Sequence, residues 1–217
     1  MREVINILMA GLVFCASAAM AAAAGTTDTR SFGSFDKIEV SRGVELHVGC
    51  GPAAKAELSG ASKDVADTTT EVSGHTLKIS RSNWIGHNES VTVRLTAPQP
   101  LVAISANTGV AAEVEACAVS PDHFDISANT GVSLDLAGST GRSVIDVSTG
   151  ARVQPLDGQR FDVRDAKVSA STGADIRLCS VGHIDGHASM GSDITADSKS
   201  GTVRTSMGAS FSVASCP

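Results

Sequence analysis

Between residues 104 and 213, hydrophobic and polar residues alternate around a short phrase that is written six times. Each copy has Asn or Ser, then Thr or Met, then Gly, and the steps between successive glycines are 22, 19, 23, 18 and 17 residues. A repeat of this length is typical of an array in which similar units stack on one another. The six glycines, which we expect to be structural turns, are Gly109, Gly131, Gly150, Gly173, Gly191 and Gly208.

Alignment on these glycines places residues of one kind in columns. The positions five before, three after and five after each Gly are mostly hydrophobic, as in Ile126, Leu134 and Leu136 around Gly131. The position four after each Gly is polar in every copy. Odd offsets therefore point inward and even offsets outward, which is the side-chain period of a β-strand.

One such strand cannot bury its inner face alone, whereas similar strands stacked in register can. The columns therefore predict an all-β, single-domain parallel β-helix (β-solenoid) with short irregular coils over residues 104–215. We expect each turn Gly to form a bend or bulge between two faces of a coil, where a Cβ would clash. An antiparallel sandwich is the alternative, because many short strands with turns also fit that architecture.

The N-terminal half also alternates, with strand patterns over residues 35–48, 54–58, 65–80 and 91–95. Ser73-Gly74 has the composition of a hairpin turn. We expect these strands to cap one end of the solenoid, and we expect no helix. Trp84 stands in the polar loop 81–90 and is either a further cap over the open end or a platform on which a sugar stacks.

The first residues have the pattern of a secretory signal. Arg2 is followed by a hydrophobic run and then by small residues, so residues 1–24 are expected to be a signal peptide, with an uncleaved membrane anchor as the alternative. Residues 25–34 are expected to be a polar leader and residues 35–217 the β-solenoid domain. The protein is then exported, to the periplasm or cell surface of a bacterium.

Charge and composition narrow the class of partner. The net charge is −6, and removal of residues 1–24 leaves it unchanged because Arg2 and Glu3 are lost together. This balance argues against nucleic acid as a partner. Beyond residue 24 we expect no membrane span. Aromatic residues make up only 3% of the chain, which fits a narrow core.

Four of the five cysteines lie beyond the signal, and an even number in an exported protein suggests disulfides. Four cysteines can be paired in three ways. The pairing that joins neighbours in sequence is Cys50–Cys117 together with Cys179–Cys216. Cys179 and Cys216 belong to coils two steps apart, roughly 9.6 Å if aligned, which exceeds the limit of about 7 Å between Cα atoms. They can therefore pair only if the C-terminal tail folds back.

The sequence contains no recognisable catalytic constellation, and we expect no cofactor. His183, Asp185 and His187 would share one face of a strand, but they lack a fourth ligand, so no metal site is predicted. Asp175 and Asp193 stand two residues after their glycines on adjacent coils, with Arg152 one coil before. These three residues and Trp84 are the candidate ligand contacts, and surface charge is the alternative for the first three.

The order of the motifs resembles the head GIN domain family, which is described as a family of "putative" autotransporter adhesins. The resemblance rests on Phe35-Asp36-Lys37-Ile38-Glu39-Val40, on Gly74-His75-Thr76-Leu77-Lys78-Ile79, on Val91-Thr92-Val93 and on the repeated Ser/Asn-Thr-Gly coils. It covers residues 35–215. The resemblance implies an exported bacterial protein with a β-helical fold and no established biochemical activity.

These observations together predict a non-enzymatic adhesion, binding or structural module whose ligand is a glycan or an envelope protein. The alternative is a polysaccharide-active β-helix enzyme, a lyase or hydrolase, that uses acidic residues on one face.

Overall fold

The computed structural model describes residues 25–82 and 90–214, and the protein is all-β, as the alternation predicts. Its strands form one open sheet of 18 strands with mixed pairing. The strands are β1 (Thr26–Ser31), β2 (Lys37–Ser41), β3 (Val44–Cys50), β4 (Lys55–Gly60), β5 (Thr68–Ser73), β6 (Thr76–Arg81), β7 (Val91–Ala97), β8 (Ala103–Asn107), β9 (Ala111–Val114), β10 (Asp125–Asn129), β11 (Ser133–Leu136), β12 (Gly138–Ser148), β13 (Arg152–Pro155), β14 (Phe161–Ser171), β15 (Asp175–Ala188), β16 (Asp193–Ser198), β17 (Gly201–Thr205) and β18 (Ser210–Val213).

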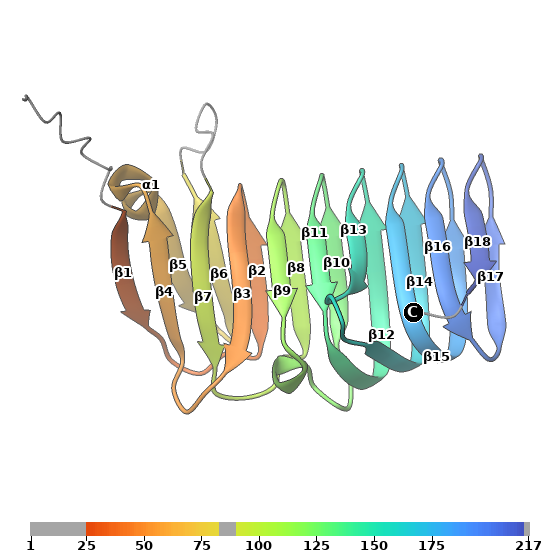
Figure 1. Cartoon of the computed structure of the whole chain (residues 1–217), viewed down its shortest axis with the longest axis horizontal. Coiled ribbons are helices and arrows are strands. Elements are labelled where there is room, and N and C mark those ends of the chain that lie inside the picture. The colour runs from red at the N-terminus through yellow and green to blue at the C-terminus, as the bar shows by residue number, and fades with distance from the viewer. Residues whose placement is uncertain (1–24, 83–89, 215–217) are drawn as a thin grey trace, which may run out of the picture.

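The sheet lies as two facing layers that run along the long axis of the molecule (Figure 1). Strand pairing joins β1, β4, β7, β3, β9, β11, β13, the first part of β15, β16 and β18 into what we call the front layer. It joins β5, β6, β2, β8, β10, β12, β14, the second part of β15 and β17 into the back layer. Tight turns connect the layers along one edge (Figure 1).

Every strand pairing described within residues 103–213 is parallel and keeps the columns of the sequence in register. Ile126, for example, lies opposite Ile104 on one side and Ile145 on the other. The pairs β1–β4, β4–β7 and β5–β6 are antiparallel and lie toward the N-terminal end. The prediction of a parallel architecture therefore needs a correction, because the sheet as a whole is mixed.

The core is the narrow space between the two layers. The inward columns fill it with Val, Ile, Leu and Ala that are almost fully buried, such as Leu134 and Ile176 at 0% exposure. Small side chains suffice because facing layers stand only about 10 Å apart. Two aromatic rings, Phe124 and Phe161, meet edge to face in this core, with centroids 6.3 Å apart. The assignment of the hydrophobic columns, at five before, three after and five after each turn Gly, to the interior is thus confirmed for most coils.

The repeated turns differ from the expected bends in one respect. At all six turn glycines φ lies between +66° and +75°, and an added Cβ would meet nothing within 4 Å. The residue before each Gly is also left-handed, from Thr108 at +59° to Met207 at +50°. Glycine is therefore needed for its backbone conformation and not for space, so the expected clash at the turn was wrong. Two left-handed residues in succession characterise the type I′ turn.

The N-terminal half differs further from the sequence-based expectation. The Ser73-Gly74 hairpin joins β5 to β6 as predicted. Residues 26–31, expected within a polar leader, form β1, which pairs with β4. A short helix, α1 (Ser62–Ala66), and a 3₁₀ turn, η1 (Ala116–Ala118), also appear where no helix was expected. Neither shows an amphipathic stripe, because each is about one turn long.

Helix α1 lies at the N-terminal end of the molecule (Figure 1). Its Asp64 makes a buried ion pair with Arg81, with 2.8 Å between Oδ1 and Nη2. Trp84, the residue suggested as a cap, and residues 1–24, the expected signal peptide, lie outside the described residues. In the described ranges no helix has both the length and the apolar character needed to cross a membrane.

Candidate binding site

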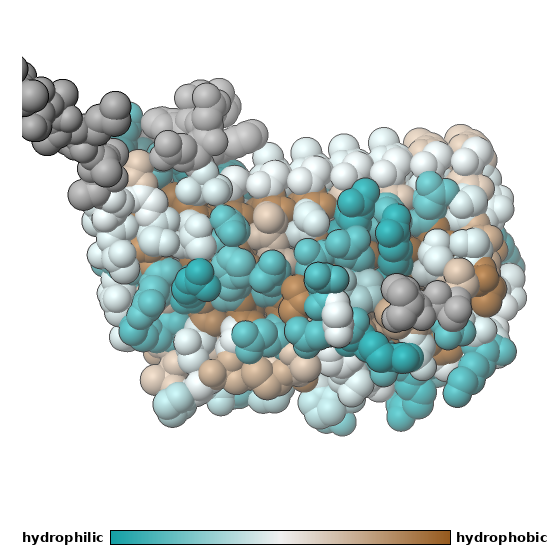
Figure 2. Space-filling model, viewed as in Figure 1, coloured by the Kyte–Doolittle hydropathy of each residue, from teal (hydrophilic) through white to brown (hydrophobic). Residues whose placement is uncertain are grey.

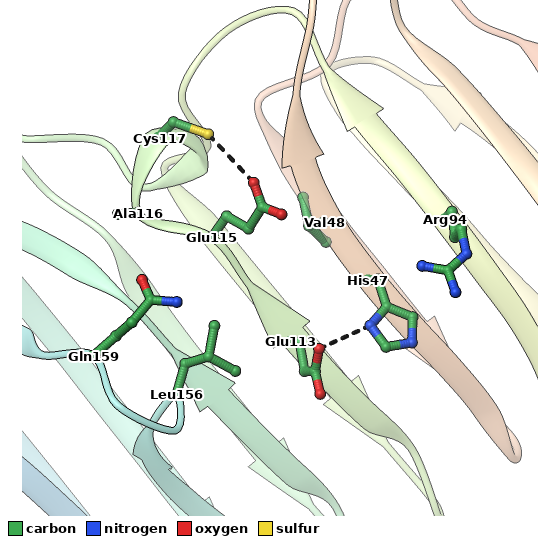
Figure 3. A pocket seen from close by; sticks show the side chains of 9 residues that line it. All are labelled: His47, Val48, Arg94, Glu113, Glu115, Ala116, Cys117, Leu156 and Gln159. Atoms are coloured by element: carbon green, nitrogen blue, oxygen red, sulfur yellow. Dashed lines mark hydrogen bonds and ion pairs between the residues drawn. The ribbon is translucent and has the colours of Figure 1, made fainter.

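A hollow of about 510 Å³ opens on the front layer where β3, β7 and β9 lie side by side. Parallel pairing places His47 of β3 directly opposite Arg94 of β7 and Glu113 of β9. All three occupy outward positions of alternating strands, so their side chains stand on the surface and not in the core. Figure 3 shows His47 and Glu113 turned toward each other, with Arg94 on the far side of His47.

The imidazole of His47 is held between two carboxylates. Its Nδ1 lies 2.9 Å from Oε2 of Glu113, and its Nε2 lies 3.2 Å from Oε1 of Glu45. Thr92 donates its hydroxyl to the other oxygen of Glu45 at 3.2 Å. The ring is thereby fixed in orientation on three neighbouring strands, which gives the floor of the hollow a defined arrangement of donors and acceptors.

The walls of the hollow come from two connections. On one side, η1 is joined to the end of β3 by the disulfide Cys50–Cys117, with 6.1 Å between the Cα atoms. On the other side, Leu156 and Gln159 reach over from the segment after β13 (Figure 3). The Sγ of Cys117 lies 3.8 Å from Oε2 of Glu115. This is a packing contact, because a disulfide sulfur carries no hydrogen to donate.

Asp135 lies next to Glu113 in the same outward row, on β11. Its Oδ1 is inaccessible and has no hydrogen-bond partner. Burial raises the pKa of the Asp135 carboxyl, a hydrogen bond with Gln154 offsets part of the rise, and the charge of Glu113 adds to it. The row therefore carries a carboxylate whose charged form is disfavoured, in the middle of the front layer.

We expect Asp135→Asn to raise the free energy of unfolding at neutral pH, by less than about 1 kcal/mol because the group is partly solvated. A carboxyl whose pKa is raised by folding stabilises the protein fully below its unfolded pKa, and that contribution is lost as the pH rises through the folded pKa. The gain should therefore shrink toward acidic pH, as measured by urea denaturation at pH 4 and pH 7. Equal gains at both pH values would contradict the electrostatic cause.

Hydrophilic side chains gather over this part of the front layer in the space-filling view (Figure 2). None of His47, Arg94 and Glu113 was predicted as a contact from the sequence. The sequence does contain a signal that could have found two of them. His47 stands three residues before Cys50, and Glu113 four residues before Cys117. The predicted disulfide brings these two strand ends together, so the outward residues just before each cysteine must be neighbours.

The candidate contacts from the sequence lie farther along the same layer. Asp175 is bridged by two arginines, with 3.1 Å to Nε of Arg152 and 3.3 Å to Nη2 of Arg177. Asp193 is opposite Asp175 in register and accepts a hydrogen bond from Ser210. The structure thus brings Arg152, Asp175 and Asp193 together, and the arginines compensate the charge of Asp175. Trp84 lies outside the described residues.

The His183, Asp185 and His187 side chains all stand on the outer face of β15, so they share one face of a strand. His183 lies 3.0 Å from Asp185 through Nε2 and 3.0 Å from Ser200 through Nδ1, and His187 lies 3.1 Å from Ser169. Within the described ranges, no three or more His, Cys, Asp or Glu side chains are grouped so that they could hold a metal.

One of the two predicted disulfides is confirmed. The disulfide Cys50–Cys117 is present. Cys179 is disulfide-bonded as well. Its predicted partner, Cys216, lies outside the described residues, so the pairing Cys179–Cys216 stays a prediction.

Comparison with known proteins gives one family and several solved structures. Residues 34–198 match the family described as "Putative auto-transporter adhesin, head GIN domain". No protein of curated function matches the chain. The chain is similar to the crystal structure of a "putative adhesin" from Bacteroides fragilis NCTC 9343, with a TM-score of 0.67, 13% identity, and coverage of 89% of this chain and 98% of that one.

A second similar structure is that of a "Putative lipid binding protein" from Parabacteroides distasonis ATCC 8503, with a TM-score of 0.51 and 13% identity. The match covers 88% of this chain and 96% of that one. At this level of identity both likenesses establish the fold and say nothing about the ligand.

Proposed function

This chain belongs to the head GIN domain family, and we propose that it is an exported, non-enzymatic binding module of the bacterial envelope that takes a glycan on its front layer. The observation that carries the proposal is the hollow around His47 and Arg94, in which hydrogen-bonding groups of opposite kinds converge on a rigid floor of strands. The signal pattern of residues 1–24 and the two disulfide-bonded sites support export, because disulfides persist in oxidising compartments.

The chemistry of the hollow fits hydroxyl groups. Arg94 can only donate hydrogen bonds, the carboxylate oxygens of Glu113 and Glu115 accept them, and Gln159 can do both. A sugar hydroxyl both donates and accepts, so a glycan chain can satisfy all of these groups at once. On the same layer, Arg152 of β13 lies two strands beyond β9 and Asp175 of β15 lies three strands beyond it, roughly 10 and 14 Å away, within reach of further sugar residues of a glycan chain.

The architecture supports a surface for extended ligands. We propose that the two layers are the two faces of a β-solenoid whose coils run from residue 104 to 215, with the antiparallel N-terminal strands closing one end. The parallel register of residues 103–213 and the recurring left-handed turns support this arrangement. A solenoid presents a long, stiff face, and repeat proteins of this kind bind their partners along such faces.

A glycan array probed with the purified chain, residues 25–217, tests the proposal. We expect Arg94→Ala to weaken binding to the retained glycan by about tenfold or more, because a charged hydrogen bond contributes roughly 1.5–3 kcal/mol. Arg142→Ala is the matched control, since Arg142 is an exposed arginine on β12 of the back layer. It should change the affinity less than about twofold.

Three outcomes contradict the proposal. Equal losses in the Arg94 and Arg142 variants would place the contact elsewhere. A blank array together with capture of one envelope protein would indicate a protein ligand. Release of oligosaccharides from a polysaccharide, abolished by Asp175→Asn or Asp193→Asn, would show that the front layer is catalytic.

A further inference from the structure

Beyond residue 24 the chain contains two methionines, and both stand in neighbouring turns of the repeat. Met190 and Met207 continue the column that holds Thr108, Thr130 and Thr149 in earlier coils. Methionine usually fills irregular gaps in protein cores. Here the described core contains none, and Met190 and Met207 are 50% and 73% exposed.

Neither the backbone nor packing favours methionine at these positions. Both residues are left-handed, with φ of +52° and +50°, which costs an L-residue roughly 1–2 kcal/mol. In two of the earlier coils the threonine hydroxyl recovers part of this cost by a hydrogen bond, since Thr108 and Thr130 donate to the preceding asparagine at 3.0 and 3.1 Å. Methionine has no such donor. Compared with the threonine of the earlier coils, methionine adds only a thioether at these two positions.

The turns that carry the two methionines stack directly on each other. The amide of Gly191 donates to the carbonyl oxygen of Met207 at 3.0 Å, just as Gly173 donates to Met190. Similar φ values and this bond make the two Cα–Cβ bonds nearly parallel, about one strand spacing of 4.8 Å apart. In the space-filling view the ridge of turns changes from white to tan toward the β17–β18 end (Figure 2).

We propose that Met190 and Met207 form a two-coordinate site for a soft monovalent cation, Cu(I), with one thioether on each side of the ion. Metal–sulfur bonds are roughly 2.3 Å long, so two opposed sulfurs stand about 4.6 Å apart, which matches the spacing of the turns. Thioethers select Cu(I) and leave Mg²⁺, Ca²⁺ and Zn²⁺ to oxygen, imidazole and thiolate ligands.

The unbound geometry requires one adjustment. The Sδ of Met190 lies 3.9 Å from Oγ1 of Thr172, so this thioether leans toward the coil before it. The contact is weak, and the three side-chain torsions of methionine allow the sulfur to turn toward Met207 at little cost. Both side chains are exposed, so no packed neighbour has to move.

Silver(I), added as the nitrate in chloride-free buffer, is a redox-stable probe of this site. We expect calorimetric titration of residues 25–217 to give one silver ion per chain at this site and a dissociation constant that is independent of pH between about 5 and 7.5. Thioethers carry no proton in that range, whereas imidazole ligands must lose theirs. The ε-methyl carbon signals of both methionines should shift together.

Three variants make the test specific. Met190→Thr and Met207→Thr restore the residue of the earlier coils and should leave the fold intact, and each should weaken silver binding by about tenfold or more. Met207→Leu keeps the size and apolar character of the side chain without its sulfur and should weaken silver binding equally.

The proposal is overturned if the Met190→Thr/Met207→Thr double variant binds silver as tightly as the parent, or if binding weakens at acidic pH as histidine ligation would. It is also overturned if Met207→Leu retains the parent affinity. A change in sedimentation on Met207→Thr with unchanged silver affinity would identify the methionines as a contact between chains.

Discussion

Replacing Gly186 by alanine is expected to lower the free energy of unfolding by about 3 kcal/mol or more. Gly186 occupies the inward column of β15, opposite Val168 of β14. A Cβ at this position would lie 1.9 Å from the carbonyl oxygen of Val168 and 2.7 Å from its Cγ2. Backbone cannot move aside as a flexible side chain can, so the β14–β15 pairing would have to open. Guanidinium denaturation measures the loss.

Gly150→Ala is the matched control for this experiment. Gly150 belongs to the repeated phrase and has φ of +67°, but its Cβ would meet nothing within 4 Å. Strain of roughly 1–2 kcal/mol is partly offset by the reduced entropy of the unfolded chain, about 0.4–1 kcal/mol. The expected net loss is about 1 kcal/mol. If Gly150→Ala proved as damaging as Gly186→Ala, the turns would be under steric constraint after all.

Removal of the Cys50–Cys117 disulfide is expected to lower the free energy of unfolding by about 4 kcal/mol. The bond joins residues 67 apart in sequence, so its loss releases a long loop in the unfolded chain. The folded state should keep its register, because Glu115 still donates its amide to Val48 at 2.9 Å. The measurement is urea denaturation of the Cys50→Ser/Cys117→Ser variant.

Treatment with a reductant distinguishes the contributions of the two disulfides to the free energy of unfolding. Reduced parent protein should lose at least as much stability as the double variant, and reduction of the double variant then reports the contribution of Cys179 alone. A change below about 0.5 kcal/mol in the double variant would show that the unfolded chain stays compact around this loop. The same variant should also weaken glycan binding, since η1 forms one wall of the hollow.

The fold could be predicted from the sequence wherever the pattern is local. Alternation fixes which residue of each strand faces the core, and repetition fixes which residues share a column, as Ile104, Ile126 and Ile145 do. The short helix α1 and strand β1 escaped prediction. Their stability comes from contacts with distant segments, such as the ion pair of Asp64 with Arg81, which no window of sequence contains.

The candidate site could be predicted only in part, because it is assembled from four separate segments. His47, Arg94, Glu113 and Gln159 are tens of residues apart, and only the parallel pairing of β3 with β7 and β9 makes neighbours of the first three. Arg152 and Asp175 were found because they share a column of the repeat. Residues that share a column of the repeat can thus be predicted as neighbours from the sequence. Residues that a single strand pairing brings together cannot.

The six Gly phrases illustrate the division between the two kinds of information. The sequence by itself determined that they are structural, recur every 17 to 23 residues and align in columns, because side-chain period and repeat length are properties of the chain. Only the tertiary structure decided that the preceding Thr or Met is left-handed too, that the turn Gly has free space around it, and that crowded glycines, such as Gly186, lie outside these turns. Crowding depends on which backbone lies alongside, and that is set by pairing between strands distant in sequence.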